Sequence, residues 1–277
     1  MKIICDAPGQ TCNRLWSYVA LLSECIVKGE KLVILFFDYT IDDFPNFRNS
    51  SYIYFPFYHR RILRIGRNWN RFKHLTWKIT HNAIFDKIFR SLGFVKGWYT
   101  RQNVEYIFMA KKELIRIFTP DQSLVLQAQE LFNNIHEQAQ VIVGVHIRRG
   151  DYATWNNGRF YYEHSDYYNF MCKVKELYHN QTVAFFISSN EPIDLSEFHE
   201  CSCFHHSIGS SAVLDLYSLS LCDKIIGPFS TFSRWASFIG EKPLCFLQDR
   251  EQDLSENSFS IITDYFHFEN GIEIEDW

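Results

Sequence analysis

The sequence predicts an α/β protein built from two Rossmann-like domains that face a cleft. Its 277 residues are enough for two medium-sized α/β domains. Strand-like and helix-like segments alternate near the start of the chain and again in its second half, which is typical of parallel sheets. The apolar run Val141–Ile147 ends abruptly in charged residues, as a buried strand does where it meets a ligand.

The first half opens with a β–α–β pattern. Apolar spacing and turn residues predict, in chain order, strands over 2–6 and 32–37 around a helix over 13–27, then helices over 104–118 and 121–138. Residues 42–100 lack a regular period, so we predict an irregular helical insert there. These elements together form a predicted N-terminal domain over residues 1–138.

The second half restarts the alternation. The pattern predicts strands over 141–147, 183–188, 224–226 and 244–247, separated by helices over 167–178, 211–220 and 232–239. We predict a C-terminal domain over residues 139–277. No internal repeat or Gly/Ser-rich linker separates the two halves, so close packing between them is expected.

Charge and cysteine usage limit the classes of partner. The net charge of −4 argues against a nucleic-acid partner. The eight cysteines are scattered without framework spacing, and the N-terminus lacks a signal-peptide layout. We therefore expect free thiols and a cytoplasmic protein. The basic segment 60–90 has two interpretations, a solvated helix face or peripheral contact with the inner face of an anionic membrane.

A metal site is disfavoured by spacing. The stretch from His199 to His206 holds five histidine or cysteine side chains, but no second ligand pair follows at the distance that zinc sites use. Cys201, Cys203 and His205 alternate as one face of a strand would. We therefore predict no metal and no cofactor.

Three loops at predicted strand ends carry polar chemistry. They are His146–Tyr152 with two arginines, Ser188–Glu191 with hydroxyls and a carboxylate, and Gly227–Arg234 with Ser230 and Thr231 at a helix start. Strand ends of a parallel sheet converge on one crevice, and guanidiniums with a helix N-terminus suit phosphate. The chain lacks a P-loop, a G-x-G-x-x-G fingerprint and a D-x-D pair, so arginines must supply the positive charge to a nucleotide diphosphate.

These motifs resemble those of the α-1,2-fucosyltransferases, glycosyltransferase family 11. His146–Tyr152 matches the family's H-x-R-R-G-D-Y motif. Asp215–Cys222 followed by Phe229–Ala236 is similar to its later D-L-x-L-M-x-x-C and S-T-F-S-W-W-A motifs. Phe185–Glu191 and Gly9–Leu15 resemble its strand end and its glycine turn.

The resemblance implies a GT-B-like, metal-independent, inverting enzyme that uses GDP-fucose as donor and an oligosaccharide or lipid-linked glycan as acceptor. The donor would bind the C-terminal domain and the acceptor would approach from the N-terminal one. The implied contacts are Arg148 and Arg149 on the β-phosphate, oriented by Asp151; His146, Ser189, Asn190 and Glu191 near guanine or ribose; Ser230, Thr231 and Phe232 on the diphosphate; and Asn13 from across the cleft.

Departures from the family pattern leave alternatives open. Arg234 replaces a tryptophan, Cys12 a glycine, and Asn190–Glu191 an acidic pair. Arg148 and Asp151 could form a structural ion pair, and Asn13, Ser230 and Thr231 could serve as helix caps. Asp151 and Asp38 are alternative candidates for the catalytic base. Another GDP-sugar as donor, or a binding protein without activity, are the alternative functions.

Overall fold

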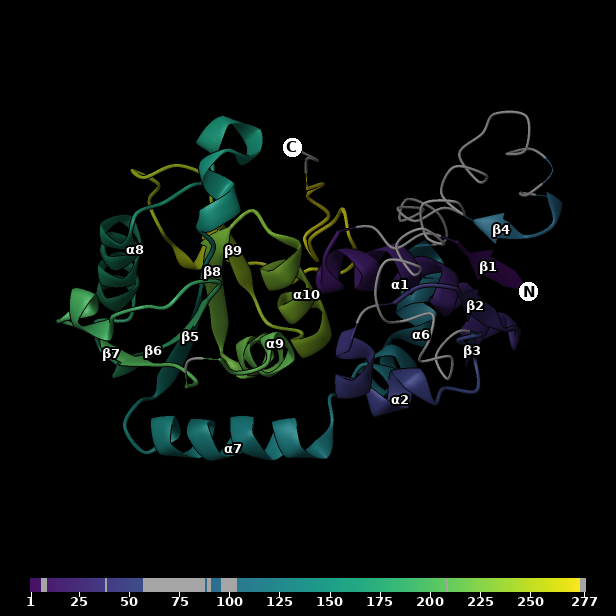
Figure 1. Ribbon diagram of the computed structural model, residues 1–277. Helices are drawn as coiled ribbons and strands as arrows, with labels where there is room; N and C mark the ends of the chain where they lie inside the picture. Colours follow the sequence, from purple (N-terminus) through teal and green to yellow (C-terminus); the bar gives the residue numbers. More distant parts are fainter. Residues whose placement is uncertain are drawn as a thin grey trace. The chain divides into compact units, whose positions relative to one another are not determined.

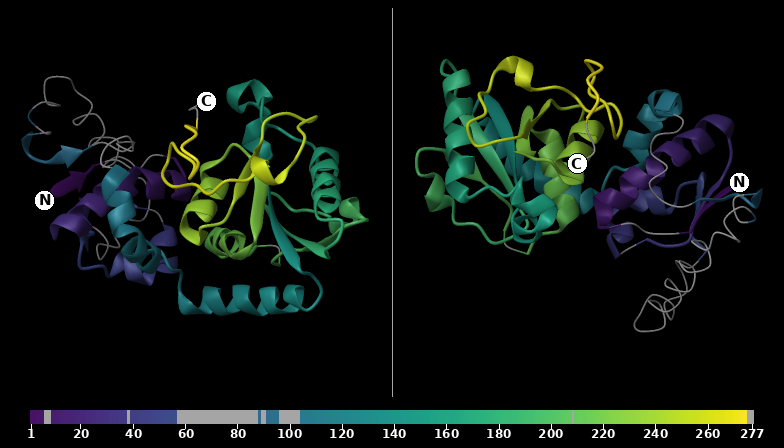
Figure 2. Two further views of the ribbon diagram at one scale, coloured as in Figure 1. Left: turned by 180° about the vertical axis from the view of Figure 1, so that it is seen from behind. Right: turned by 90° about the horizontal axis from the view of Figure 1, so that it is seen from above.

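The chain divides into two compact units, which we describe separately. In the computed structural model the described residues are 1–5, 9–37, 39–56, 88, 91–95, 104–207 and 209–274. The units are Met1–Asp121 and Gln122–Trp277 (Figures 1 and 2). The division falls ahead of helix α7 (Gln122–His136), whereas the predicted boundary follows it. Phe132 of this helix packs on Phe186 of the second unit, with ring centroids 5.7 Å apart.

The first unit contains a parallel sheet of order β3-β2-β1-β4. Its described elements are β1 (Lys2–Ile4), α1 (Thr11–Lys28), β2 (Leu32–Ile34), α2 (Pro45–Arg48), β3 (Ile53–Tyr54), β4 (Phe94–Val95) and α6 (Val104–Ile117). The predicted β–α–β start is confirmed. Strands β3 and β4 were not predicted, because two residues are too few to show an alternating pattern.

Helix α1 ends at a glycine, the residue most common just after the end of a helix. Gly29 adopts a left-handed φ of 64°, and its N–H donates to the carbonyls of Cys25 and Ile26. Leu15, Trp16 and Leu22 are fully buried along the helix. Burial of this apolar face, rather than intrinsic helix propensity, accounts for most of the stability of such a helix.

The second unit is a five-stranded parallel sheet of order β7-β6-β5-β8-β9. Its main elements are β5 (Val141–Ile147), α8 (His164–Leu177), β6 (Val183–Ser189), β7 (Ser202–Phe204), α9 (Ala212–Leu221), β8 (Lys224–Pro228), α10 (Thr231–Gly240) and β9 (Leu244–Leu247). Strand β5 lies at the centre, so the order β6-β5-β8 places the ends of three consecutive motifs side by side (Figure 1).

The two faces of β5 meet different helices because successive side chains alternate. Val145 and Ile147 join a core cluster with Tyr167 and Phe170 of α8. Gly144 lies on the other face, where an added Cβ would come within 2.7 Å of the Leu219 side chain of α9. The glycine in an otherwise β-branched strand therefore gives α9 its close approach to the sheet.

A second close approach joins β5 to β8. A Cβ at Gly227 would lie 2.9 Å from both Cβ and the carbonyl oxygen of His146. We expect Gly227→Ala to destabilise the second unit by about 1–3 kcal/mol, because strand backbone must shift to admit the methyl group. Thermal unfolding measures this loss. Gly271→Ala, where φ is 79° but an added Cβ meets nothing within 4 Å, is the control for strain alone; an equal loss in both variants would contradict the clash.

Two predictions concern membranes. Across the described ranges, no helix is both long and apolar enough to cross a bilayer. The basic segment 60–90 lies outside the described residues except for Ile88, so its peripheral membrane contact stays a prediction.

Candidate functional site

The carboxyl ends of β5, β6 and β8 form one edge of the second sheet. Register pairs His146 with Ser188 and Ile147 with Ser189, and β8 pairs with β5 on its other side. Ligands of parallel α/β sheets bind at this edge. The structure brings together there the predicted residues of the second unit: His146, Arg148, Arg149, Asp151, Ser189, Asn190, Glu191, Ser230, Thr231 and Phe232.

His146 is a neutral, buried imidazole at the end of β5. Its ring stacks on Phe232 with centroids 5.0 Å apart. Burial, aided by the charge of Arg148, lowers the pKa of His146 to about 3. Its Nδ1 is buried and makes no hydrogen bond within the part of the chain that is described. A buried nitrogen of this kind is suited to receive a ligand, because leaving it unpaired costs free energy.

Arg149 is held on several sides by the protein itself. Its guanidinium lies 2.7 Å from a carboxylate oxygen of Glu163 and 2.7 Å from one of Glu191. Its backbone N–H donates to the Asn190 side chain at 2.9 Å, and the ring of Tyr161 lies 5.1 Å from its guanidinium carbon. The contact with Glu163 is a hydrogen-bonded ion pair, and the contact with Glu191 is an ion pair without hydrogen-bond geometry. The contact of Arg149 with the β-phosphate stays a prediction.

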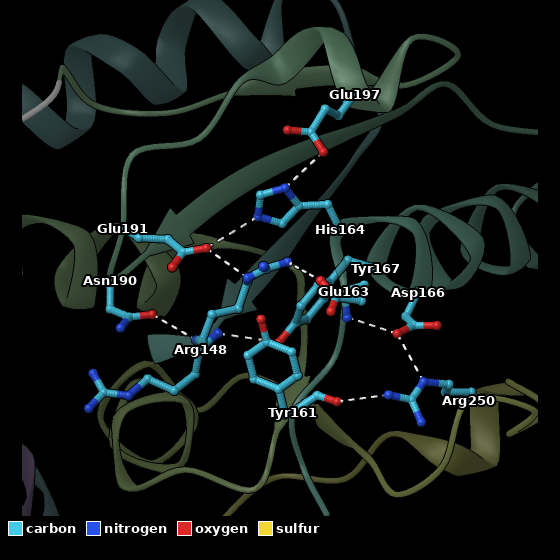
Figure 3. Close-up of polar contacts among 11 residues, drawn as sticks. Arg148, Tyr161, Glu163, His164, Asp166, Tyr167, Asn190, Glu191, Glu197 and Arg250 are labelled. Carbon is cyan, nitrogen blue, oxygen red and sulfur yellow. Dashed lines mark hydrogen bonds and ion pairs between the residues drawn. The ribbon is translucent and has the colours of Figure 1, made fainter. Parts of the chain in front are cut away.

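A histidine extends the carboxylate cluster around Arg149. Nε2 of His164 lies 3.5 Å from Glu191, and its Nδ1 lies 2.8 Å from Glu197 (Figure 3). The Glu163 N–H donates to Asp166 at 2.8 Å, which caps the start of α8. The cluster therefore ties Arg149 to the first turn of α8 and to the loop after β6.

Arg148 has a different environment from its neighbour. Figure 3 shows its side chain directed away from the cluster of Glu191, His164 and Glu197. It pairs with Asp151 at 2.9 Å and lies over the ring of Tyr152, 5.5 Å from the centroid. The Asp151 side chain is 60% exposed, and an ion pair so close to solvent contributes little stability. A phosphate can therefore replace Asp151 at this guanidinium at small cost.

Three residues predicted at the end of β6, namely Ser189, Asn190 and Glu191, stabilise the loops that follow β5 and β6. Ser189 accepts the Glu191 N–H at 3.2 Å, which closes the turn. Gly150 needs its φ of 59°, and an added Cβ there would lie 3.3 Å from Nδ2 of Asn190. Asn190 and Glu191 hold Arg149, so the structure gives these two residues a positioning role; contact of either with a nucleotide base stays a prediction.

The loop after β8 combines a cap with a helix N-terminus. Ser230 caps α10 by accepting the Phe232 N–H at 3.2 Å, and Thr231 is the first residue of this helix. The Tyr152 hydroxyl donates to the Phe229 carbonyl at 2.7 Å, which links this loop to the loop that carries Arg148. Burial raises the pKa of Tyr152, so the hydroxyl keeps its proton. N–H groups at a helix start favour an anion.

Arg234, the departure from the family motif, occupies an aromatic cage. Its side chain is fully buried. Its guanidinium carbon lies 4.5 Å from the ring centroid of Phe229, 4.4 Å from that of Tyr265 and 5.7 Å from that of Phe246, and Nη1 donates to the Tyr265 carbonyl at 2.6 Å. A planar guanidinium stacks on aromatic faces as an indole would, so the replacement preserves a flat group beside Phe229.

Asp215 is a site residue that the sequence analysis did not select. It lies in the first turn of α9 and accepts hydrogen bonds from Ser188 at 3.2 Å and Ser210 at 3.4 Å. Burial raises the pKa of its carboxyl group to about 6, against the opposing effect of both hydroxyls. Ser188 is the register partner of His146, so the carboxylate reaches the same edge. Its place at the head of the Asp215–Cys222 motif was the available signal.

Comparison with known proteins identifies the family. Residues 45–256 match the description Glycosyl transferase family 11. The chain belongs to glycosyl transferase family 11. No curated protein matches it significantly.

Solved structures show the fold that this family 11 chain shares. It resembles NodZ alpha-1,6-fucosyltransferase soaked with GDP-fucose, with a TM-score of 0.56, 17% identity, and 88% of this chain and 94% of that chain covered. A second structure, fucosyltransferase NodZ from Bradyrhizobium, has a TM-score of 0.56 at 17% identity over 90% and 96% of the two chains. An Arabidopsis thaliana FUT1 mutant in complex with GDP has a TM-score of 0.51 at 11% identity over 99% and 79%. The GT-B-like fold prediction is confirmed.

Two further predicted positions of the family 11 chain belong to its first half. Asn13 belongs to the first turn of α1 in the first unit, where its side chain fills the space that a Cβ at Gly9 would need. Its contact with the donor stays a prediction. Asp38 lies outside the described residues.

The cysteine and histidine stretch forms part of strand β7. Cys203 lies within this edge strand, as the alternating pattern suggested. In the part of the chain that the structure describes, no group of three or more histidine, cysteine, aspartate or glutamate side chains is arranged to hold a metal ion.

Proposed function

We propose that this glycosyltransferase transfers L-fucose from GDP-fucose to a hydroxyl of a glycan, with inversion at C1 and without a metal ion. The acceptor position that we propose is O2 of galactose in an oligosaccharide or lipid-linked glycan of the cell surface. The observation that carries the proposal is the Arg148 guanidinium, whose own partner is the largely exposed Asp151. The NodZ structures, one co-crystallised with GDP and one soaked with GDP-fucose, share this fold and support the proposal.

The diphosphate would bind between the loops that follow β5 and β8. Arg148 supplies the positive charge, and the start of α10 supplies hydroxyl and N–H donors from Ser230 and Thr231. Arg149, already neutralised by Glu163 and Glu191, keeps the loop in shape. Arg148, positioned by its contacts with Asp151 and Tyr152, is a preorganised cation suited to charge that grows during the reaction.

The guanine base would be read by Asp215 and His146. Guanine presents two adjacent donors, N1–H and the 2-amino group, and an ionised carboxylate accepts both. Asp215 is a buried carboxylate at this edge. His146 is a neutral imidazole whose buried Nδ1 can form one hydrogen bond with the base. Two hydroxyls and the nearby His205 offset only part of the cost of burying this charge, so the carboxylate gains from two further donors.

Transfer then proceeds by departure of GDP from C1 of the sugar. The C1–O bond breaks and its electron pair goes to the β-phosphate, where Arg148 stabilises the developing charge. The acceptor oxygen attacks the opposite face of C1, forms the new C1–O bond and gives up its proton. A general base on the acceptor face receives that proton. Asp151 pairs with Arg148 on the phosphate side, so its proposed role is to orient that arginine.

Donor and acceptor screening tests this function. GDP-fucose and GDP-mannose are each incubated with lactose, lacto-N-biose or no acceptor, and released GDP and the NMR-determined product linkage are recorded. We expect turnover with GDP-fucose, an α-1,2 linkage and full activity in EDTA. Turnover of GDP-mannose alone, or an activity lost in EDTA and restored by Mn²⁺, would refute the proposal.

A further inference from the structure

The loop that follows the arginine motif presents an aromatic ring to solvent. Trp155 is 37% exposed, although it belongs to a ring cluster. Its ring lies 4.8 Å from that of Tyr152 at an interplanar angle of 36°, and 5.7 Å from that of Phe160 at 33°. Both neighbouring rings pack against the indole at tilted angles, so they hold it in place. The exposed part of this residue belongs to a large and mostly apolar side chain.

The backbone of this loop is held in an uncommon conformation. Asn156 and Asn157 have φ values of 46° and 56°, and Gly158 follows with a φ of 74°. Asparagine adopts left-handed backbone more readily than most residues with a side chain, which fits its presence at both positions. Both asparagines are exposed, so their side-chain amides are accessible to a ligand. Two amides with donors and acceptors therefore stand next to the indole.

One aromatic ring separates Trp155 from the arginine that we assign to the diphosphate. Tyr152 packs against Trp155 on one side and contacts the Arg148 guanidinium on another. Phe160, the second ring under Trp155, stacks on Phe229 with centroids 5.8 Å apart. Because Phe229 precedes Ser230 directly, the ring cluster links both phosphate-side loops. The exposed indole thus lies at the rim of the proposed donor site.

We propose that Trp155, Asn156 and Asn157 form a subsite for a galactose ring of the acceptor glycan. The subsite belongs to the second unit and adds to the N-terminal approach of the acceptor that the resemblance implies. The hydrogens on C3, C4 and C5 of β-galactose make one apolar face, which fits a half-exposed indole. The hydroxyls at the edge of the sugar are both donors and acceptors, as the two amides are. The inference rests on the proposed function, because it names the acceptor side of the same reaction.

Kinetics with separated substrates tests the subsite. In Trp155→Ala, the KM for lactose should rise about tenfold, with the KM for GDP-fucose within twofold of its original value; Trp155→Phe, which keeps a ring, should recover most of the loss. Phe108→Ala, which removes a 58% exposed ring in the first unit, is the matched control and should change neither KM. An unchanged lactose KM in Trp155→Ala would overturn the subsite.

A second variant guards against misfolding. The double substitution Asn156→Gly and Asn157→Gly removes both amides, while glycine accepts positive φ without strain. We expect normal thermal unfolding and a lactose KM raised severalfold. An unchanged lactose KM in this folded variant would count against the amides and overturn the subsite as proposed.

Saturation-transfer NMR measures sugar binding at the subsite without the transfer reaction. Methyl β-galactoside, with maltose as the control sugar, is added to the original protein and to Trp155→Phe and Trp155→Ala. We expect a signal at galactose H3, H4 and H5 that is lost in Trp155→Ala, even if GDP-fucose proves not to be the donor. Equal signals in all three proteins would refute the subsite and leave the donor assignment unaffected.

Discussion

Replacing Arg148 with alanine is expected to lower kcat for transfer by about 10²–10³-fold, while the fold stays intact. Removing one preorganised group that stabilises a developing anion typically costs about 2.7–4 kcal/mol of barrier. The structural cost is small, because the ion pair with the exposed Asp151 contributes little. Steady-state kinetics with GDP-fucose and thermal unfolding measure the two quantities. Arg148→Lys should fall in between, since an ammonium keeps the charge but loses the planar fork.

Arg149→Ala provides the contrast. Its removal leaves Glu163 and Glu191 without their shared cation and opens the loop, so we expect a lower melting temperature together with lower activity. Arg116→Ala, which breaks an exposed pair with Glu113 in the first unit, is the control for loss of an arginine. Near-normal kcat in Arg148→Ala would remove the basis of the proposed mechanism.

Asp215→Asn is expected to weaken donor binding about 10²-fold, because truncating a buried charged partner typically costs about 2–5 kcal/mol. The same change should stabilise the protein at pH 7. The pKa of this carboxyl group is raised from 3.8 to about 6, so the folded state binds its proton more tightly than the unfolded chain does. Stability from this group is therefore present below pH 3.8 and is lost as the pH rises through about 6. Ionisation of this carboxyl group over that pH range lowers the free energy of unfolding by about 3 kcal/mol.

The pH dependence of donor use follows from the same carboxyl group. Only the ionised Asp215 accepts both guanine donors, so kcat/KM for GDP-fucose should fall as the pH drops below about 6. In Asp215→Asn this limb should be absent. Asp194→Asn, at an exposed cap that accepts the Ser196 N–H, is the matched control. A variant that binds GDP normally, or that melts at a lower temperature at pH 7, would contradict the assignment.

The sequence predicted the second sheet well where the strands are buried on both faces. The bounds of β5 and β9 match the prediction, because runs of apolar residues end sharply at charged or turn residues. Strand β7 lies at the sheet edge and has three residues, so its pattern suggested a strand face without defining its bounds. Helix α8 begins at His164, ahead of the predicted 167, because the capping residues Glu163 and Asp166 are polar and hide the start.

Part of the site depends on contacts that a linear sequence does not encode. Arg148 and Arg149 are chemically identical neighbours, and only the tertiary positions of Glu163 and Glu191 give them different roles. Asp215 was visible in a motif, but its burial and its raised pKa arise from packing of α9 against the sheet. Residue type and strand-end position therefore located the site. The different roles of its residues depend on tertiary contacts and could not be predicted from the sequence.

The hydrogen bond from Tyr152 to the Phe229 carbonyl affects the free energy of donor binding. It fastens two loops that are far apart along the chain before any nucleotide arrives. Ordering flexible side chains on association costs about 0.5–1.5 kcal/mol each, and a pocket with its walls already joined avoids much of that loss. Joining the two loops in advance should therefore strengthen donor binding, and Tyr152→Phe should raise the Kd for GDP in titration calorimetry.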